Sequence, residues 1–242
     1  MCQNVMCQNV MCQNVLCQKV LCQNVMCLKA SQGADSEFDG SRTVLASHWQ
    51  GQRFNSPNDV VVKSDGSIWF TDPTYGIDSN YEGDAAPSEI GASNVYRLDP
   101  ASGEVTAAAT DFVKPNGLAF SPDESWLYVV DTGATHVANG PRHIRRFRVG
   151  ADGKSLTGGE VFVESTSGLF DGFRFDSEGR IWTSVGEGVH VYAPDGELIG
   201  KILIPEIVGN VTFGGTKRNR LFIAGTTSLY SFYTFVTGAR PG

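Results

Sequence analysis

Cysteine is missing from most of this chain. All six cysteines of the 242 residues fall within the first 27, at intervals of five residues, and none follows. This spacing fits neither a disulfide framework nor a zinc-binding motif. A body without cysteine has no need of an oxidising compartment, so the sequence predicts a cytoplasmic protein.

Positive charge and long apolar runs are also scarce. The 19 lysines and arginines are outnumbered by 26 aspartates and glutamates, and the resulting net charge of −7 argues against binding to nucleic acid or to an anionic membrane. No apolar run is long enough to cross a bilayer, and the first residues lack the pattern of a secretory signal. We therefore expect neither nucleic acid nor a membrane as a partner.

Two common catalytic arrangements are absent as well. The motif Gly-x-Ser-x-Gly of serine esterases does not occur. The histidines share no register with one another, so a histidine-based dyad is not indicated; they are His48, His136, His143 and His190.

The first residues form a short tandem repeat. Residues 1–25 repeat Met-Cys-Gln-Asn-Val with few changes. On a helix, five residues advance by about 500°, so successive repeats turn by roughly 140° and no apolar face forms. On a strand, an odd period places the same residue on alternate faces. We therefore predict that residues 1–34 are a low-complexity segment outside the fold and that residues 35–242 form the folded domain. A functional role for the repeat is the alternative.

From residue 37 onward, short apolar strands alternate with tight turns. Turn pairs such as Asp65-Gly66 and Asp195-Gly196 separate apolar runs, as in β-hairpins, and no stretch has convincing helical periodicity. Four successive segments repeat the order strand, turn, strand, third strand, and three of them add a fourth strand. This repeat predicts an all-β fold, a β-propeller of about four blades plus a fragment. A β-sandwich is the alternative, but it does not require each unit to open with the same kind of residue.

Oxygen-bearing side chains open the first strand of each unit. They are Asn58, Asn116, Asp171 and, in the fourth unit, Asn210. The first strand of a propeller blade lines the central channel, so these residues are expected to converge on its axis. Amide and carboxylate oxygens suit Ca²⁺, Mg²⁺ or Mn²⁺ better than a tetrahedral zinc site. Any one of them alone reads better as a turn former, but their shared register predicts a common site.

Several motifs of the body occur together in one known family. They are Asn55-Ser-Pro-Asn-Asp-Val-Val, Trp69-Phe-Thr-Asp-Pro-Thr-Tyr-Gly, Pro115-Asn-Gly-Leu-Ala-Phe-Ser-Pro-Asp, Asp171-Gly-Phe and Phe213-Gly-Gly. In this combination, which covers residues 37–233, the chain resembles the gluconolactonase / senescence-marker-protein (regucalcin) family. The resemblance implies a six-bladed propeller that binds one divalent metal in its channel and hydrolyses sugar lactones or related esters. The implied metal is usually Ca²⁺, with Mg²⁺, Mn²⁺ or Zn²⁺ as alternatives.

The same resemblance implies roles for individual residues. Asn116 and Asp171 match the family's metal ligands, and Asn58 matches a channel asparagine that contacts substrate, or the metal through water. Asp171 also matches the carboxylate proposed as general base, although a bound cation would lower its pKa and weaken it in that role. Asp59 and Asn210 are expected to face the substrate.

One part of the family pattern is missing. The family's first metal ligand is a glutamate in a Glu-Gly-Pro type motif, and this chain has none; Asp35, Glu37 and Asp39 do not match it. Losing a charged ligand lowers the expected metal affinity. A propeller of about four blades also leaves sheet edges open, which predicts self-association.

Two functions of different classes follow. The first is a metal-dependent hydrolase of sugar lactones or related esters, in which water attacks a carbonyl polarised by the metal; phosphotriesters are an alternative substrate. The second is a degenerate propeller without catalysis that binds small molecules or a partner. Saturable binding of a divalent cation separates the two.

Residues around the predicted site are expected to be structural. We predict structural roles for Asp72 and Asp131, and blade-core packing for Trp69, Trp126 and Trp182. The insertion at residues 75–91 either shapes substrate access or is a plain surface loop.

Overall fold

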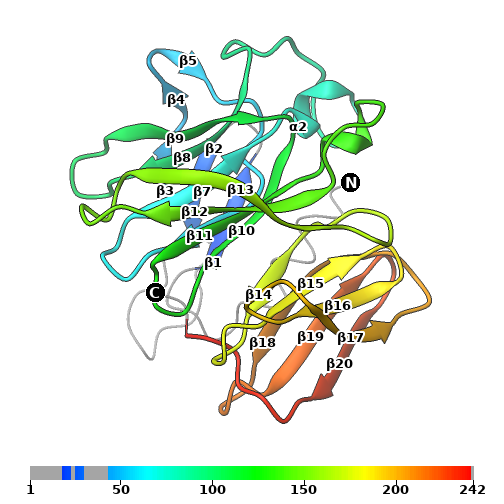
Figure 1. The fold of residues 1–242 in the computed structure, drawn as a ribbon. Helices are drawn as coiled ribbons and strands as arrows, with labels where there is room; N and C mark the ends of the chain where they lie inside the picture. Colours follow the sequence, from blue (N-terminus) through cyan, green and yellow to red (C-terminus); the bar gives the residue numbers. More distant parts are fainter. Residues whose placement is uncertain (1–17, 23–24, 30–42, 241–242) are drawn as a thin grey trace.

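Four consecutive antiparallel sheets make up most of the molecule (Figure 1). The structure is a computed structural model, and it describes residues 18–22, 25–29 and 43–240. We call the sheets the first to fourth blades. The first contains β6 (Val60–Val62), β7 (Ile68–Asp72), β8 (Ser93–Leu98) and β9 (Val105–Phe112). The second contains β10 (Pro115–Phe120), β11 (Trp126–Asp131), β12 (His143–Val149) and β13 (Leu156–Glu164).

The third and fourth blades follow in the same order. The third contains β14 (Phe173–Phe175), β15 (Ile181–Val185), β16 (Gly188–Tyr192) and β17 (Leu198–Leu203). The fourth has three strands among the described residues: β18 (Val208–Gly214), β19 (Arg220–Gly225) and β20 (Leu229–Tyr233). This succession confirms the predicted all-β propeller.

Helices contribute little to the described chain. Its helical elements are the four-residue α2 (Tyr75–Asp78) and the 3₁₀ turn η1 (Gly133–Thr135). None of the described helices has the length and apolar character that a membrane crossing requires. The cytoplasmic location stays a prediction.

Smaller sheets precede the first blade. A three-stranded sheet consists of β1 (Gln18–Cys22), β2 (Val25–Lys29) and β3 (Thr43–Ala46), in which β2 pairs with β3 across Cys27 and Val44. A short ribbon follows, β4 (His48–Trp49) with β5 (Gln52–Arg53). Two described stretches of the segment that we placed outside the fold are thus strands: β2 pairs with β3 of the body, and β1 pairs with β2. The domain boundary at residue 34 stays a prediction.

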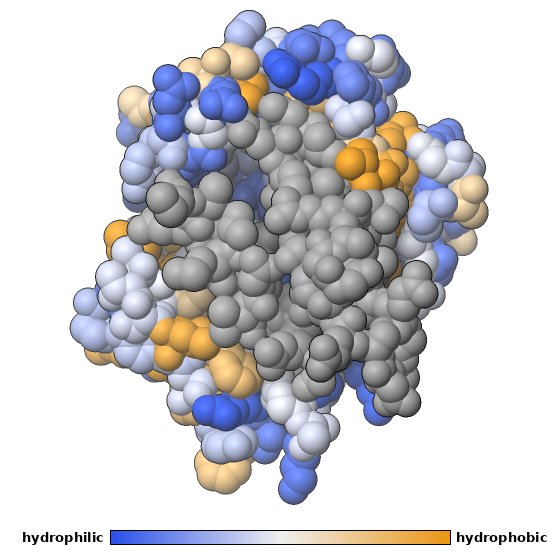
Figure 2. All heavy atoms as spheres, turned by 180° about the vertical axis from the view of Figure 1, so that it is seen from behind, coloured by the Kyte–Doolittle hydropathy of each residue, from blue (hydrophilic) through white to orange (hydrophobic). Residues whose placement is uncertain are grey.

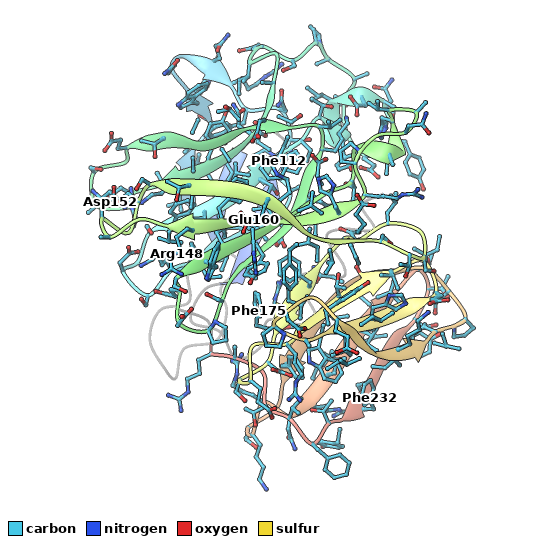
Figure 3. All side chains as sticks on the ribbon, in the orientation of Figure 1. Phe112, Arg148, Asp152, Glu160, Phe175 and Phe232 are labelled. Carbon is cyan, nitrogen blue, oxygen red and sulfur yellow. The ribbon has the colours of Figure 1, made fainter. Side chains whose placement is uncertain are left out.

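Aromatic rings on the second strand of each of the first three blades pack against the next blade. Trp69 meets Phe120 at 5.5 Å between ring centroids, Tyr128 meets Phe175 at 5.1 Å, and Trp182 meets Phe213 at 5.5 Å. Each of these phenylalanines lies toward the end of the next blade's first strand; Phe175 lies between the second and third blades in Figure 3. Edge-to-face pairs of this kind are worth about 0.5–1.5 kcal/mol beyond the area they bury. The blade-core role of Trp69 and Trp182 therefore agrees with the structure.

The second blade uses a different residue at this position. Tyr128, not Trp126, makes the contact with the next blade. Trp126 is half-buried and lies beneath the guanidinium groups of Arg146 and Arg148, at 5.0 and 5.1 Å. The register explains the difference, because Tyr128 lies opposite Ala119 within β10, whereas Trp126 lies beyond the end of that pairing.

Packing between blades brings their first strands together. Strand β10 contacts both β6 and β14, and β14 contacts β18. The four strand openings that the sequence singled out therefore follow one another across neighbouring blades.

Candidate functional site

Three of the predicted site residues form one connected group. Asn58 Nδ2 donates a hydrogen bond to Asn116 Oδ1 at 2.5 Å, although the two residues are 58 positions apart. The side chain of Asn116 in turn hydrogen-bonds the carboxyl group of Asp171. The three residues come from the first, second and third blades, so blade packing creates the group.

Buried backbone contacts hold the first two members in register. The Thr71 hydroxyl donates to the backbone oxygen of Asn116 at 2.9 Å and accepts the N–H of Asp59 at 3.0 Å. The Asn58 N–H donates to the Thr71 oxygen at 2.8 Å. Thr71 is fully buried, so its hydroxyl bonds to both blades without competition from water. This residue ties the opening of β6 to the opening of β10.

Glycines after Asn116 and Asp171 allow the blades to approach closely. A Cβ at Gly117 would lie 2.2 Å from the backbone oxygen of Asp171, and a Cβ at Gly172 would lie 2.1 Å from Asn210 Oδ1. Any residue larger than glycine at 117 would therefore push the second and third blades apart, and one at 172 would displace the Asn210 side chain. In each pair, Asn116-Gly117 and Asp171-Gly172, the first residue offers a side-chain oxygen, and the glycine leaves room for a residue of the next blade.

Asp171 is held in an environment that disfavours its negative charge. Its pKa is raised to about 7, chiefly by desolvation and also by the charges of Asp59 and Glu82, while the hydrogen bond from Asn116 opposes the rise. Part of the residue stays open to solvent, but protein surrounds the carboxyl group on most sides. Among the described residues, no lysine, arginine or histidine lies within ion-pair distance of it. A cation bound beside Asp171 would stabilise its ionised carboxylate and lower its pKa.

Asp59 has other partners. Its Oδ1 accepts the N–H of Val60 at 2.8 Å, its Oδ2 accepts the N–H of Leu118 at 3.3 Å, and Arg174 Nη1 lies 3.9 Å away. The carboxylate is buried and links the first blade to the second. Its role toward a substrate stays a prediction, while its charge clearly acts on Asp171.

Asn210 lies at the next position around the group. Its side chain occupies the space that a Cβ at Gly172 would need, and its Oδ1 accepts the N–H of Val211 at 2.8 Å. Asn210 therefore lies in the blade next to that of Asp171. Contact between Asn210 and a substrate stays a prediction.

The sequence analysis assigned no individual roles to Tyr75 and the residues around it. The Tyr75 hydroxyl lies 2.5 Å from Thr132 Oγ1, which also receives Asn116 Nδ2 at 3.4 Å. Burial raises the pKa of Tyr75, and the charge of Asp171 raises it further, which places this hydroxyl near the site. The buried Lys114 ammonium lies 5.0 Å from the centre of the Tyr75 ring and bonds Thr74 and Asp78. In the sequence, Tyr75 could be noticed only as part of the family motif Trp69-Phe-Thr-Asp-Pro-Thr-Tyr-Gly.

Asp72 and Asp131 hold loops in place, as predicted. Asp72 accepts the N–H groups of Asn55 and Ser56 at 3.0 and 2.9 Å. Asp131 does the same in the second blade, where it accepts the N–H groups of Val113 and Lys114 at 3.0 and 2.9 Å. Each aspartate ends a second strand and fixes the loop that leads into a first strand.

The donors of the connected group fit a hard divalent cation. Asp171 supplies a carboxylate that has no cationic side chain within ion-pair distance among the described residues. Asn58 and Asn116 carry amide oxygens, of which Asn116 Oδ1 accepts the Asn58 amide, and these are the ligand types that Ca²⁺ prefers. Within the described part of the chain, no three histidine, cysteine, aspartate or glutamate side chains gather to hold a metal ion. A cation here would depend on amide oxygens beside one carboxylate.

Comparison with known proteins gives consistent matches. The family profile described as SMP-30/gluconolactonase/LRE-like region matches residues 17–227. A gluconolactonase of Zymomonas mobilis is 33% identical over 213 residues, covering 81% of this chain and 55% of that protein. The solved structure of a gluconolactonase from Xanthomonas campestris superposes with a TM-score of 0.77 at 36% identity, covering 91% of this chain and 69% of that one.

A more distant structure shares the fold. Regucalcin from Agrobacterium tumefaciens, described as a calcium-binding protein, superposes with a TM-score of 0.67 at 24% identity, covering 93% of this chain and 74% of that one. The chain spans about half the length of the curated relatives it matches.

Proposed function

The chain belongs to the SMP-30/gluconolactonase/LRE-like family, and from this premise we propose that it hydrolyses sugar lactones or related esters with the help of one divalent cation. The observation that carries the proposal is the connected group Asn58–Asn116–Asp171 at the openings of three neighbouring first strands. The names of the Zymomonas and Xanthomonas relatives support gluconolactone as the first substrate to test.

The proposed cation is bound by Asp171 and Asn116, with Asn58 as a direct or water-mediated ligand. Calcium is the first choice because the donors are all oxygens and because the regucalcin of the same fold is described as calcium-binding. When bound, such a cation polarises a carbonyl and stabilises the negative charge that develops on its oxygen. Mg²⁺, Mn²⁺ and Zn²⁺ are the alternatives to compare.

The chain's own residues have defined tasks in this mechanism. The amide groups of Asn58 and Asn116, fixed by their mutual hydrogen bond and by Thr71, orient the lactone. A water molecule adds its oxygen to the ring carbonyl carbon and loses a proton, for which Asp171 is the proposed acceptor. The bond between that carbon and the ring oxygen then breaks, the ring oxygen takes up a proton, and the product is the open-chain hydroxy acid.

The test measures both metal binding and turnover. We expect calcium-dependent hydrolysis of glucono-1,5-lactone, and we expect both a chelator and Asp171→Asn to abolish it, with a loss of at least about 100-fold. Asp195→Asn is the matched control, because Asp195 is an exposed turn residue that accepts the N–H of Glu197 at 3.1 Å. Calorimetric titration of calcium into the same proteins reports binding without any turnover.

The two readouts together decide between the proposed functions. Saturable calcium binding that is lost in Asp171→Asn, without turnover of lactones, esters or phosphotriesters, would favour a metal-containing binding module. Absence of saturable binding by any of the four cations would contradict the proposed site itself.

A further inference from the structure

The aromatic contacts between blades show which residue of the fourth blade corresponds to Asn116 and Asp171. In the second, third and fourth blades, the first strand receives an aromatic ring of the preceding blade on a phenylalanine: Phe120, Phe175 or Phe213. Asn116, Asp171 and Gly209 lie four residues before these phenylalanines. The fourth blade therefore has a glycine at the position where the second and third blades have an oxygen-bearing side chain.

The ladder between first and second strands gives the same alignment. Asn210 pairs with the second strand of its blade at the step where Gly172 does in the third blade. The residues before them, Gly209 and Asp171, therefore correspond to each other. Asn210 itself lies one residue farther along the strand than the ligand position.

Gly209 lies against the third blade, at the proposed metal ligand. Its backbone oxygen accepts the N–H of Gly172 at 3.0 Å. A Cβ added to Gly209 would lie 3.7 Å from Asp171 Oδ2. Apart from its own chain neighbours, no other atom of the described residues would come within 4 Å of that Cβ. A side chain at residue 209 would therefore begin beside the carboxylate of Asp171.

Neither close packing nor backbone conformation explains this glycine. A Cβ at Gly117 or Gly172 would meet the next blade at 2.2 or 2.1 Å, whereas 3.7 Å is an ordinary contact. The φ angle of Gly209 also lies outside the left-handed range that favours glycine. Within the described part of the chain, the effect of this glycine is to leave space beside Asp171.

The space has the right distance from Asp171 for one further oxygen on the proposed cation. Ca²⁺ holds its oxygens at about 2.3–2.6 Å, so oxygens on neighbouring coordination positions lie about 3–4 Å apart. The 3.7 Å between Asp171 Oδ2 and a Cβ at residue 209 falls in this range. Ca²⁺ takes about six to eight oxygens, more than Asn58, Asn116 and Asp171 supply, so positions are left for water and substrate.

We propose that residue 209 is a specificity-determining position, where glycine leaves the fourth-blade side of the cation open and the carbonyl oxygen of the lactone binds. This inference rests on the proposed function. A carbonyl bound there lies beside Asp171, the proposed acceptor of the proton from the attacking water. A side chain at residue 209 that carries its own oxygen would take the place of the carbonyl.

Gly209→Asp separates metal binding from turnover. The added carboxylate supplies the oxygen that the substrate otherwise brings, so calcium affinity, measured by titration calorimetry, should rise by about tenfold or more. The value of kcat/KM for glucono-1,5-lactone should fall by at least about tenfold, because the carbonyl position is filled.

Gly200→Asp is the matched control for the added charge. A Cβ at Gly200 would also make an ordinary contact, 3.6 Å from Val191, and the residue lies on the outer strand β17. Polar side chains already cover much of the described surface seen from behind in Figure 2, so one more charge on an outer strand is in keeping with it. This variant should change neither calcium affinity nor turnover.

Two further variants keep the test decisive if the added charge disturbs folding, which near-ultraviolet circular dichroism reports. Gly209→Asn offers a neutral oxygen and should shift both values in the same directions as Gly209→Asp, by a smaller factor. Gly209→Ala fills the space without an oxygen. It should lower kcat/KM by about tenfold while calcium affinity stays within about threefold of the wild type.

The outcomes distinguish this inference from the proposed function. If the wild type binds calcium but Gly209→Asp and Gly209→Asn bind it no more tightly than Gly200→Asp, the inference alone is overturned. Tighter binding with unchanged turnover would place the carbonyl elsewhere and overturn it as well. A wild type that binds no calcium contradicts the proposed function. A gain of binding in Gly209→Asp would then still support the place of residue 209 beside Asp171, and no gain would overturn both.

Discussion

Two aspartates with the same raised pKa illustrate how surroundings decide a residue's role. Burial raises the pKa of both Asp72 and Asp171 to about 7. Asp72 is closed off and accepts two backbone N–H groups, so it serves as a brace for the loop before β6. Asp171 faces the charges of Asp59 and Glu82, and only the Asn116 side chain opposes the rise in its pKa. The second environment suits a cation, and the first suits a structural role.

At the residue scale, the pKa of Asp171 predicts how calcium binding depends on pH. Calcium requires the ionised carboxylate, so below pH 7 it must displace a proton. The ionised fraction falls from about nine-tenths at pH 8 to about one-tenth at pH 6, so calcium affinity should weaken by about tenfold over this range. Titration calorimetry at several pH values, in buffers of different ionisation enthalpy, measures both the affinity and the released proton. Affinity that stays constant from pH 6 to pH 8 would show that Asp171 is not a ligand.

A second prediction at this scale concerns the Tyr75 hydroxyl. Tyr75→Phe removes the contact with Thr132, which also receives the Asn116 amide, so Asn116 should be held less firmly. One hydrogen bond of this kind is worth about 1 kcal/mol, so kcat for lactone hydrolysis should fall by about fivefold while the fold stays intact. Tyr81→Phe is the matched control, because Tyr81 lies on the same insertion and is 78% exposed. Equal activity of both variants would mean that Tyr75 does not position the site.

At the scale of elements, blade-to-blade distance is set at the openings of the first strands. Gly117 in β10 touches the backbone of Asp171, and Gly172 touches the side chain of Asn210. The aromatic contacts, such as Trp69 with Phe120, act farther along the same strands. Close approach at one end and ring packing at the other together fix the angle between neighbouring blades.

Gly117→Ala tests this geometry. The added Cβ would lie 2.2 Å from the Asp171 oxygen, so the third blade must shift. Overpacking of this kind costs about 1–3 kcal/mol of unfolding free energy, and the shift should also weaken calcium binding. Gly200→Ala is the control, because its Cβ would meet its nearest neighbour, Val191, at an ordinary 3.6 Å. Urea unfolding and calcium titration of both variants provide the measurement, and equal stability of the two would contradict the argument.

At the scale of the whole molecule, the metal-free protein should lose stability as pH rises. The pKa values of Asp72 and Asp171 are about 7 in the folded state and 3.8 as model values, so the folded state keeps protons that the unfolded chain releases. Their contribution is full below pH 3.8 and is lost as pH rises through 7. His143, whose pKa burial lowers, acts in the opposite direction below pH 6.5, but it is only half-buried.

The expected fall in unfolding free energy from pH 5 to pH 8 is about 3 kcal/mol, after allowing for the partial solvent exposure of Asp171. Urea unfolding in chelator at each pH measures it. Calcium at pH 8 should restore the part that belongs to Asp171. Stability that rises from pH 5 to pH 8 in chelator would contradict the proposed burial of these two groups.

The sequence by itself determined the fold class, the order of strands and the positions that open each first strand. These follow from local signals, because turn pairs such as Asp65-Gly66 and the alternation of apolar residues act over a few neighbours. The repeat then placed Asn58, Asn116 and Asp171 in equivalent positions of successive blades.

Only the tertiary structure decided what these residues contact. The bond between Asn58 and Asn116 joins residues 58 positions apart, and Tyr75 reaches Thr132 across 57, so neither contact has a local signal. The same holds for Asp59, whose carboxylate accepts the N–H of Leu118 in the next blade. The physical reason is that strand period and turn chemistry fix each blade separately, whereas the angle and distance between blades depend on side-chain packing across them.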